Sequence, residues 1–251
     1  MKKVKLLSIA VSTGSYSDFV TNIIDSAVSH KSNYTCVANV HMLVEAHQDK
    51  SFATLIRNAL FITPDGKPLS WALRLLYGIK QDRVAGMDLL PDLLGQAATE
   101  KIPVFFYGGT NELLTKTETY LAQNFPGLTI AGMYSPPFRD LTREESDLIV
   151  DKINASGARL VFVVLGCPKQ EKWIASMKGR IQGMMVAVGG ALPVLVGMQK
   201  RAPKWMQDAG LEWLFRLIQE PKRLLKRYLV TNTKFVYLLT KEYLRLKISR
   251  S

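Results

Sequence analysis

Short apolar runs alternate with longer amphipathic stretches over most of the chain, and this alternation limits the possible folds more than any other feature. The apolar runs have the length of strands, and the stretches between them repeat at helical spacing. Such alternation predicts a mostly parallel sheet with helices on both faces. Strands are expected at 4–11, 34–40, 60–63, 103–107, 128–133, 159–165 and 184–188, and helices at 18–29, 41–58 (one or two), 68–77, 87–100, 110–124, 141–155 and after 168.

The strand signal stops after Val196, and the chain from Trp205 onward has a helical pattern. A length of 251 residues suits one large domain with an extension. We therefore expect an α/β core with a Rossmann-like sheet over residues 1–197. Residues 198–251 are expected to form a basic helical segment, which we call the appendage. Hydrophobic residues make up 47% of the sequence, enough for a sizeable core.

The appendage is both basic and apolar. From Arg201 to Ser251 there are 12 Lys or Arg against 4 Asp or Glu, so most of the formal net charge of +12 lies there. A basic segment with an apolar helical face favours an anionic surface, most simply that of a membrane. The apolar face predicted from spacings of four and three consists of Leu225, Leu229, Asn232, Val236, Leu239, Tyr243 and Leu246.

Composition leaves other interpretations of this helix open. It could instead dock on its own domain or on a partner subunit. Nucleic acid is a third option, but the chain has no recognisable nucleic-acid motif, and no such partner is expected. No apolar run approaches the roughly 18 residues that a membrane-spanning helix needs. Any membrane contact is therefore expected to be peripheral.

Several common chemistries have no motif here. Cys36 and Cys167 lie far apart and form no CxxC pair, so we expect a reduced, cytosolic protein. His41 and Glu45 are four residues apart, but no HExxH follows, and neither Asp-x-Asp nor Gly-x-Ser-x-Gly occurs. We expect neither a metal site nor a cofactor.

Asp65 is the first candidate for chemistry. It lies in a Pro-Asp-Gly turn directly after a predicted strand. Pro, Asp and Gly all favour tight turns, so turn formation alone explains the sequence. However, ligands of open α/β sheets bind where strands end, and a carboxylate there could serve as a general base.

Glycine-containing loops follow three other predicted strands. Gly108-Gly109 and Gly189-Gly190 would let the backbone approach a phosphate, although plain tight turns are equally consistent with them. In the segment 166–171, Pro168 suits the first helical turn, and Lys169 and Gln170 would project above the sheet. The alternative there is a solvated helix start with an acidic residue favoured by the helix dipole. The expected donor-side residues are Gly108, Gly109, Gly166, Pro168, Lys169, Gln170, Glu171 and Gly189.

Arg83 precedes a predicted helix, and a surface ion pair with Asp82 or Asp88 would explain it. Taken with the loops above, however, Arg83 belongs to a series of segments that resembles the WecG/TagA/CpsF glycosyltransferases, family 26. The series runs in the family's order from about residue 34 to 229. It comprises Ala38–Leu43, Pro64–Gly66, Arg83–Asp88, Tyr107–Gly109, Leu165–Glu171, Arg201–Gln207, Gly210–Arg216 and Glu220–Arg223, and Ser135–Arg139 resembles the exopolysaccharide branch.

The resemblance implies a metal-independent, inverting transfer of a sugar from a nucleotide donor, usually UDP-linked. The donor sugar would be N-acetylmannosamine, its uronic acid or a mannose-type hexose. The acceptor would be a polyprenyl-diphosphate-linked saccharide at the cytoplasmic face of the plasma membrane. A non-catalytic membrane-surface binding or scaffold protein of the same fold is the alternative.

The resemblance also implies roles for particular residues. Asp65 would be the general base, Asn39 would hold the sugar or the base, and Arg83 and Gln170 would contact the donor's diphosphate or sugar. Leaving-group charge would be met by arginines, backbone N–H groups and helix N-termini. The arginines that the appendage would place over the site are Arg216, Arg223 and Arg227.

Two positions depart from the family's pattern. Val37 stands where the family often has Thr, which removes a hydroxyl near the base. Leu192-Pro193-Val194 replaces the frequent Phe-Asp-Phe, which removes a carboxylate. Both departures affect the expected donor specificity more than the reaction class.

Overall fold

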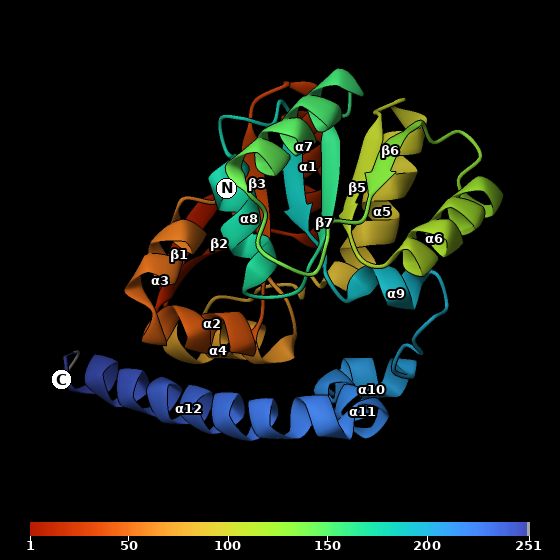
Figure 1. Cartoon of the computed structure of the whole chain (residues 1–251). Helices are drawn as coiled ribbons and strands as arrows, with labels where there is room; N and C mark the ends of the chain where they lie inside the picture. Colours follow the sequence, from red (N-terminus) through yellow and green to blue (C-terminus); the bar gives the residue numbers. More distant parts are fainter. Residues whose placement is uncertain (250–251) are drawn as a thin grey trace.

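The computed structural model describes residues 1–249. The central sheet contains β3 (Asn33–Ala38), β4 (Phe61–Pro64), β5 (Val104–Gly108), β6 (Ile130–Tyr134), β7 (Leu160–Val164) and β8 (Met184–Ala187). All neighbouring strands are parallel, in the order β4-β3-β8-β7-β5-β6. Helices cover both faces of this sheet (Figure 1). The predicted α/β fold class is confirmed.

The helices of this part of the chain lie close to their predicted positions. Asp49 divides the stretch 41–58 into two helices, because its carboxylate caps the second one through the N–H groups of Ser51 and Phe52. Thr142 and Glu145 form the predicted capping box. The helices are α1 (Tyr16–Val28), α2 (Val40–Gln48), α3 (Lys50–Arg57), α4 (Lys67–Tyr77), α5 (Gly86–Thr99), α6 (Asn111–Asn124), α7 (Arg143–Ala155), α8 (Lys169–Met177) and α9 (Ala191–Leu195).

The sheet separates two apolar layers. In β7, Val161 and Val163 pack with α7 and α8, whereas Leu160, Phe162 and Val164 pack with α5 and α6. Successive side chains of a strand point to opposite faces, so a central strand covered on both sides must be apolar throughout. This explains the continuous apolar run of β7. Because both faces of the sheet are covered, polar residues can reach a ligand only at the ends of the strands.

The single strand predicted over 4–11 is wrong. The structure has an antiparallel hairpin there, with β1 (Lys2–Leu6) paired to β2 (Ile9–Thr13). Leu7 adopts a positive φ of 56° at the turn, a conformation that Leu rarely takes, so the sequence carries no turn signal. β2 packs beside β4, where the Ile62 N–H donates to the Ser12 hydroxyl. The hairpin thereby covers an edge strand of the sheet.

The appendage is helical, as its pattern predicts. It contains α10 (Lys204–Asp208), α11 (Glu212–Gln219) and α12 (Pro221–Ile248). The 28-residue α12 passes along the core beneath α2 and α4 (Figure 1). Its buried side chains are those of Leu224, Thr231 and Phe235.

The predicted apolar face of α12 is only partly the face that docks. Leu239 and Leu246 pack against the core, but Leu225, Leu229 and Val236 are 50%, 63% and 61% exposed. Spacings of four and three fit two adjacent stripes equally well, and the core covers the stripe beginning at Leu224. α12 therefore has a docked face and a second, exposed apolar face. Within residues 1–249, no helix combines the length and apolarity needed to cross a membrane.

Candidate active site

A cavity of about 1490 Å³ lies at the carboxyl ends of the parallel strands. Its wall is formed by the loops after these strands and by α11 and α12. Most of the predicted site residues come together there, although they are scattered along the sequence. They are Asn39, Asp65, Gly109, Gly166, Lys169, Gln170, Glu171, Gly189, Arg216, Arg223 and Arg227. Arg83, Gly108 and Pro168 are not among the residues that line the cavity.

Strand register places Asn39 beside Asp65. Ala38 of β3 pairs with Pro64 at the end of β4, so the next residue of each strand occupies the same edge. The Asp65 N–H donates to the Ala38 carbonyl at 2.7 Å. Asn39 also caps α2, because its Oδ1 accepts from the Met42 N–H at 3.1 Å. Two polar side chains are thus held at the ligand-binding edge of the sheet.

Asp65 is only partly exposed, in the cavity wall. Burial raises the pKa of Asp65 to about 7, and the Glu212 carboxylate on α11 also raises it. The guanidinium groups of Arg83 and Arg216 act in the opposite direction, because positive charge favours the ionised carboxylate. A carboxylate with a pKa near neutrality can accept a proton during a reaction and later release it.

Gln170, in the first turn of α8, has its side-chain amide fixed on several sides. Its Oε1 accepts from the Gly166 N–H at 3.0 Å, and its Nε2 donates to Glu171 Oε1 at 2.8 Å. At Gly189, after β8, a Cβ would lie 2.9 Å from Gln170 Oε1. The missing side chain at Gly189 therefore lets the Gln170 amide lie close over the strand end.

The alternative of a solvated helix start is wrong for Glu171. Its side chain is fully buried, and burial raises the pKa of its carboxyl. The Gln170 amide and the Cys167 thiol both hydrogen-bond to Glu171. Glu171 thus faces inward, although helix position alone favours an exposed acidic residue there. Lys169 is exposed at the cavity, and Pro168 stands directly before α8.

Gly108 and Gly109 have different local surroundings. A Cβ on Gly108 would lie 2.5 Å from the Val164 carbonyl oxygen, so the close approach of β5 to β7 requires glycine there. Gly109 lines the cavity, and α6 begins after the capping residue Thr110. The structure therefore explains Gly108 through packing and places Gly109 where a ligand can approach its backbone.

Three arginines of the appendage reach the cavity. Arg216 of α11 lies over the end of β8. A Cβ added to Gly190, which follows β8, would be 2.8 Å from the Nη2 atom of Arg216. Arg227 of α12 lines the cavity, and its buried Nε has no hydrogen-bond partner. Arg223 lines the cavity and also pairs with Glu220. Their convergence gives the cavity a positive rim suited to an anion.

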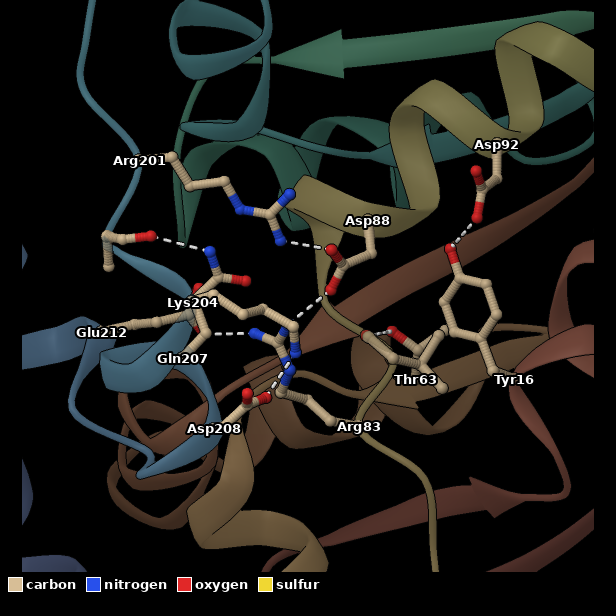
Figure 2. Close-up of polar contacts among 12 residues, drawn as sticks. Tyr16, Thr63, Arg83, Asp88, Asp92, Arg201, Lys204, Gln207, Asp208 and Glu212 are labelled. Carbon is tan, nitrogen blue, oxygen red and sulfur yellow. Dashed lines mark hydrogen bonds and ion pairs between the residues drawn. The ribbon is translucent and has the colours of Figure 1, made fainter.

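Arg83 lies outside the cavity wall. It forms ion pairs with Asp88 of α5, at 2.6 Å, and with Glu212 of α11 (Figure 2). Of the sequence alternatives, a pair with Asp88 is confirmed. The side chain is only 13% exposed, so this is not a surface pair. Asp82 instead accepts from the Tyr16 N–H.

Sequence reasoning assigned no role to Glu212 within the segment Gly210–Arg216, although Glu212 lines the cavity and acts on the pKa of Asp65. The available signal was its spacing of four from Arg216, which places both residues on one helix face. Within residues 1–249, no group of three or more His, Cys, Asp or Glu side chains is arranged to hold a metal ion.

Comparison with known proteins connects this geometry to a family. Residues 4–249 match the glycosyl transferase WecG/TagA/CpsF family. The chain is also 36% identical, over 216 residues, to an N-acetylglucosaminyldiphosphoundecaprenol N-acetyl-beta-D-mannosaminyltransferase of Bacillus spizizenii. That alignment covers 82% of this chain and 82% of the relative. The match extends through both the strand-end loops and the arginine-bearing helices, and the chain therefore belongs to the WecG/TagA/CpsF family of glycosyltransferases.

Proposed function

We propose that this glycosyltransferase moves a sugar from a UDP-linked donor to a polyprenyl-diphosphate-linked saccharide in cell-surface polysaccharide biosynthesis. The proposed sugar is N-acetylmannosamine, its uronic acid or a mannose-type hexose. The observation that carries the proposal is a carboxylate, Asp65, with its pKa raised to about 7 in a cavity that also exposes three arginines. Similarity to the Bacillus spizizenii transferase supports the lipid-linked acceptor.

The proposed reaction is a single displacement with inversion. The acceptor hydroxyl oxygen forms a bond to the anomeric carbon as the bond from that carbon to the donor's diphosphate oxygen breaks. Asp65 takes the proton that the hydroxyl loses, and one carboxylate suffices for one displacement. Asn39, which lies beside Asp65 through strand register, is proposed to hold the sugar or the base.

The departing nucleoside diphosphate gains negative charge, which must be stabilised. We propose that Arg216, Arg223 and Arg227 supply that stabilisation without a metal ion or other cofactor. The support is their convergence on one cavity and the unpartnered Nε of Arg227. Gln170 and Lys169 are proposed to contact the donor from α8, and Gly109, Gly166 and Gly189 to leave room for it.

We also propose that residues 1–197 form the catalytic core and that the appendage lies on the anionic cytoplasmic face of the plasma membrane. The exposed apolar side chains of α12, which lie among lysines and arginines, support this placement. They would meet the lipid surface while the opposite face of the helix packs on the core. The outward-facing residues are Leu225, Leu229, Val230, Val236, Tyr237, Tyr243, Leu244 and Ile248.

A transfer assay tests the proposed reaction. We expect product from the full chain with UDP-N-acetylmannosamine, or with another UDP-sugar of a panel, and N-acetylglucosaminyl-diphosphoundecaprenol in detergent micelles. Mass spectrometry of the lipid product and measurement of released UDP should agree one to one. Excess EDTA should leave the rate unchanged. If no nucleotide sugar supports transfer or hydrolysis, the proposed donor class is wrong.

A vesicle assay tests the proposed membrane surface. Leu229→Glu combined with Val236→Glu should weaken sedimentation with phosphatidylglycerol-containing vesicles about tenfold or more, because apolar contact is lost and anionic lipid repels the new charges. Leu148→Glu is the matched control, since Leu148 is 68% exposed but lies on α7. Equal sedimentation of the double variant and the control would show that this face does not bind the membrane.

A further inference from the structure

Four charged side chains connect the core to the appendage in an unbroken series. Arg201 pairs with Asp88, Asp88 with Arg83, and Arg83 with Glu212 (Figure 2). The two inner members, Asp88 and Arg83, belong to the core. The two outer members belong to the appendage, one in the segment before α10 and one at the start of α11. We call this series the ion-pair chain.

The ion-pair chain is more shielded than ordinary surface pairs. The side chains of Arg83 and Glu212 are 13% and 19% exposed, and those of Asp88 and Arg201 are 30% and 32% exposed. Exposed pairs contribute little, but removing one partner of a shielded pair leaves the other charge poorly solvated. Replacing one member by an uncharged residue should therefore leave the charge of its neighbour in the ion-pair chain poorly solvated and destabilise the contact between core and appendage.

Apolar packing holds α11 only in part: Leu214, Phe215 and Leu217 are half-buried, and Trp213 packs edge-on against Tyr228 of α12. None of its eight residues is fully buried, although its neighbour α12 buries three. Glu212 lies at the first position of α11, where a carboxylate also suits the helix N-terminus. One turn later on the same face, Arg216 lies over the end of β8. A contact that fixes Glu212 therefore also fixes where Arg216 points.

We propose that the ion-pair chain seats α11 over the cavity, and that Glu212 and Arg83 are positioning residues that act through Arg216. This rests on the proposed function only in the step from Arg216 to catalysis. It differs from the role that family resemblance implies for Arg83, which is direct contact with the donor. Arg83 is enclosed by two carboxylates and is not part of the cavity wall.

A double-mutant cycle separates these two roles of Arg83. Measured on the high-pH plateau, where Asp65 is ionised and its neighbours no longer set its protonation, Arg83→Gln and Glu212→Gln should each lower kcat/KM by about tenfold or more. If both residues act through one ion pair, the double variant should lose no more than the worse single variant. Independent contact between Arg83 and the donor would instead give losses that multiply. Glu212→Asp should retain more activity than Glu212→Gln, because it keeps the charge.

Hydrogen exchange of the full chain gives a readout that does not depend on catalysis. Each single variant should speed exchange of the α11 amides about tenfold or more, while the α1 amides remain unchanged. Glu242→Gln is the matched control, because Glu242 pairs with Arg245 within α12 and lies outside the cavity wall. This control should change neither the α11 exchange nor kcat/KM.

The two readouts assign a failure to its cause. Unchanged α11 exchange in both single variants, or multiplying losses in the cycle, would overturn the positioning role. If the wild-type enzyme transferred no sugar, the proposed function would fail, whereas the exchange data would still decide whether the ion-pair chain holds α11.

Discussion

Replacing Asp65 with asparagine is expected to lower kcat/KM for sugar transfer by about 10²–10⁴-fold, the usual contribution of a positioned general base. Asparagine keeps the size of the side chain but cannot accept the hydroxyl proton. The fold should remain intact, because the strand-end contact of residue 65 is made by its backbone N–H to Ala38. Steady-state kinetics with the lipid acceptor, together with the melting temperature, measure both expectations.

Asp140→Asn is the matched control for this substitution. Asp140 is an exposed carboxylate that also lines the cavity, but no role is assigned to it. The control should transfer sugar at the wild-type rate. Transfer by Asp65→Asn within a few-fold of wild type, with an unchanged melting temperature, would show that Asp65 is not the base.

The pH dependence of the wild-type enzyme gives a second check on Asp65. The pKa of Asp65 is raised to about 7, chiefly by burial. Below this value the carboxyl is protonated and cannot accept a proton, so kcat/KM should fall about tenfold per pH unit. Above it, the rate should reach a plateau. In Asp65→Asn, the residual kcat/KM should not show this fall at low pH.

The core of the fold was predictable because burial on both faces leaves a simple sequence pattern. The continuous apolar runs of β7 and β8 mark them as central strands. The N-terminal hairpin was missed because its turn at Leu7 uses a positive φ without a residue that favours it. The stripe of α12 that docks on the core was not identified, because the sequence holds two adjacent apolar stripes and only tertiary packing chooses between them.

The sequence predicted which loops form the candidate site, but not which of its residues contact one another. Any parallel sheet brings the loops after its strands to one edge, and this led to Asp65 and Gln170, whereas the role assigned to Asn39 came from the family resemblance. That Asn39 adjoins Asp65 depends on the register of β3 and β4, which the sequence does not specify. The pairing of Arg83 with Glu212 spans 129 residues, so no local pattern indicates it. Long-range ion pairs of this kind required the structure.

Removing the guanidinium of Arg216 is the second change expected to have a large effect. Arg216→Ala should lower kcat by about 10²–10³-fold, the cost typical of losing one group that stabilises developing negative charge. Arg216→Lys should recover only part of this loss, because a lysine keeps the charge but not the planar pair of donors. Arg245→Ala is the control, since Arg245 is an exposed arginine of the same appendage that pairs with Glu242.

Gly190→Ala tests the position of Arg216 without removing it. The backbone of Gly190, with φ −68°, accepts alanine, but the new Cβ would lie 2.8 Å from Arg216 Nη2 and displace this flexible group. We therefore expect a loss of kcat smaller than that of Arg216→Ala, with an unchanged melting temperature. When Gly190→Ala is combined with Arg216→Ala, it should lower kcat no further, because the guanidinium that it displaces is absent. If Arg216→Ala stays within twofold of wild type, the leaving group is stabilised elsewhere, and Arg227, with its unpartnered Nε, becomes the next arginine to replace.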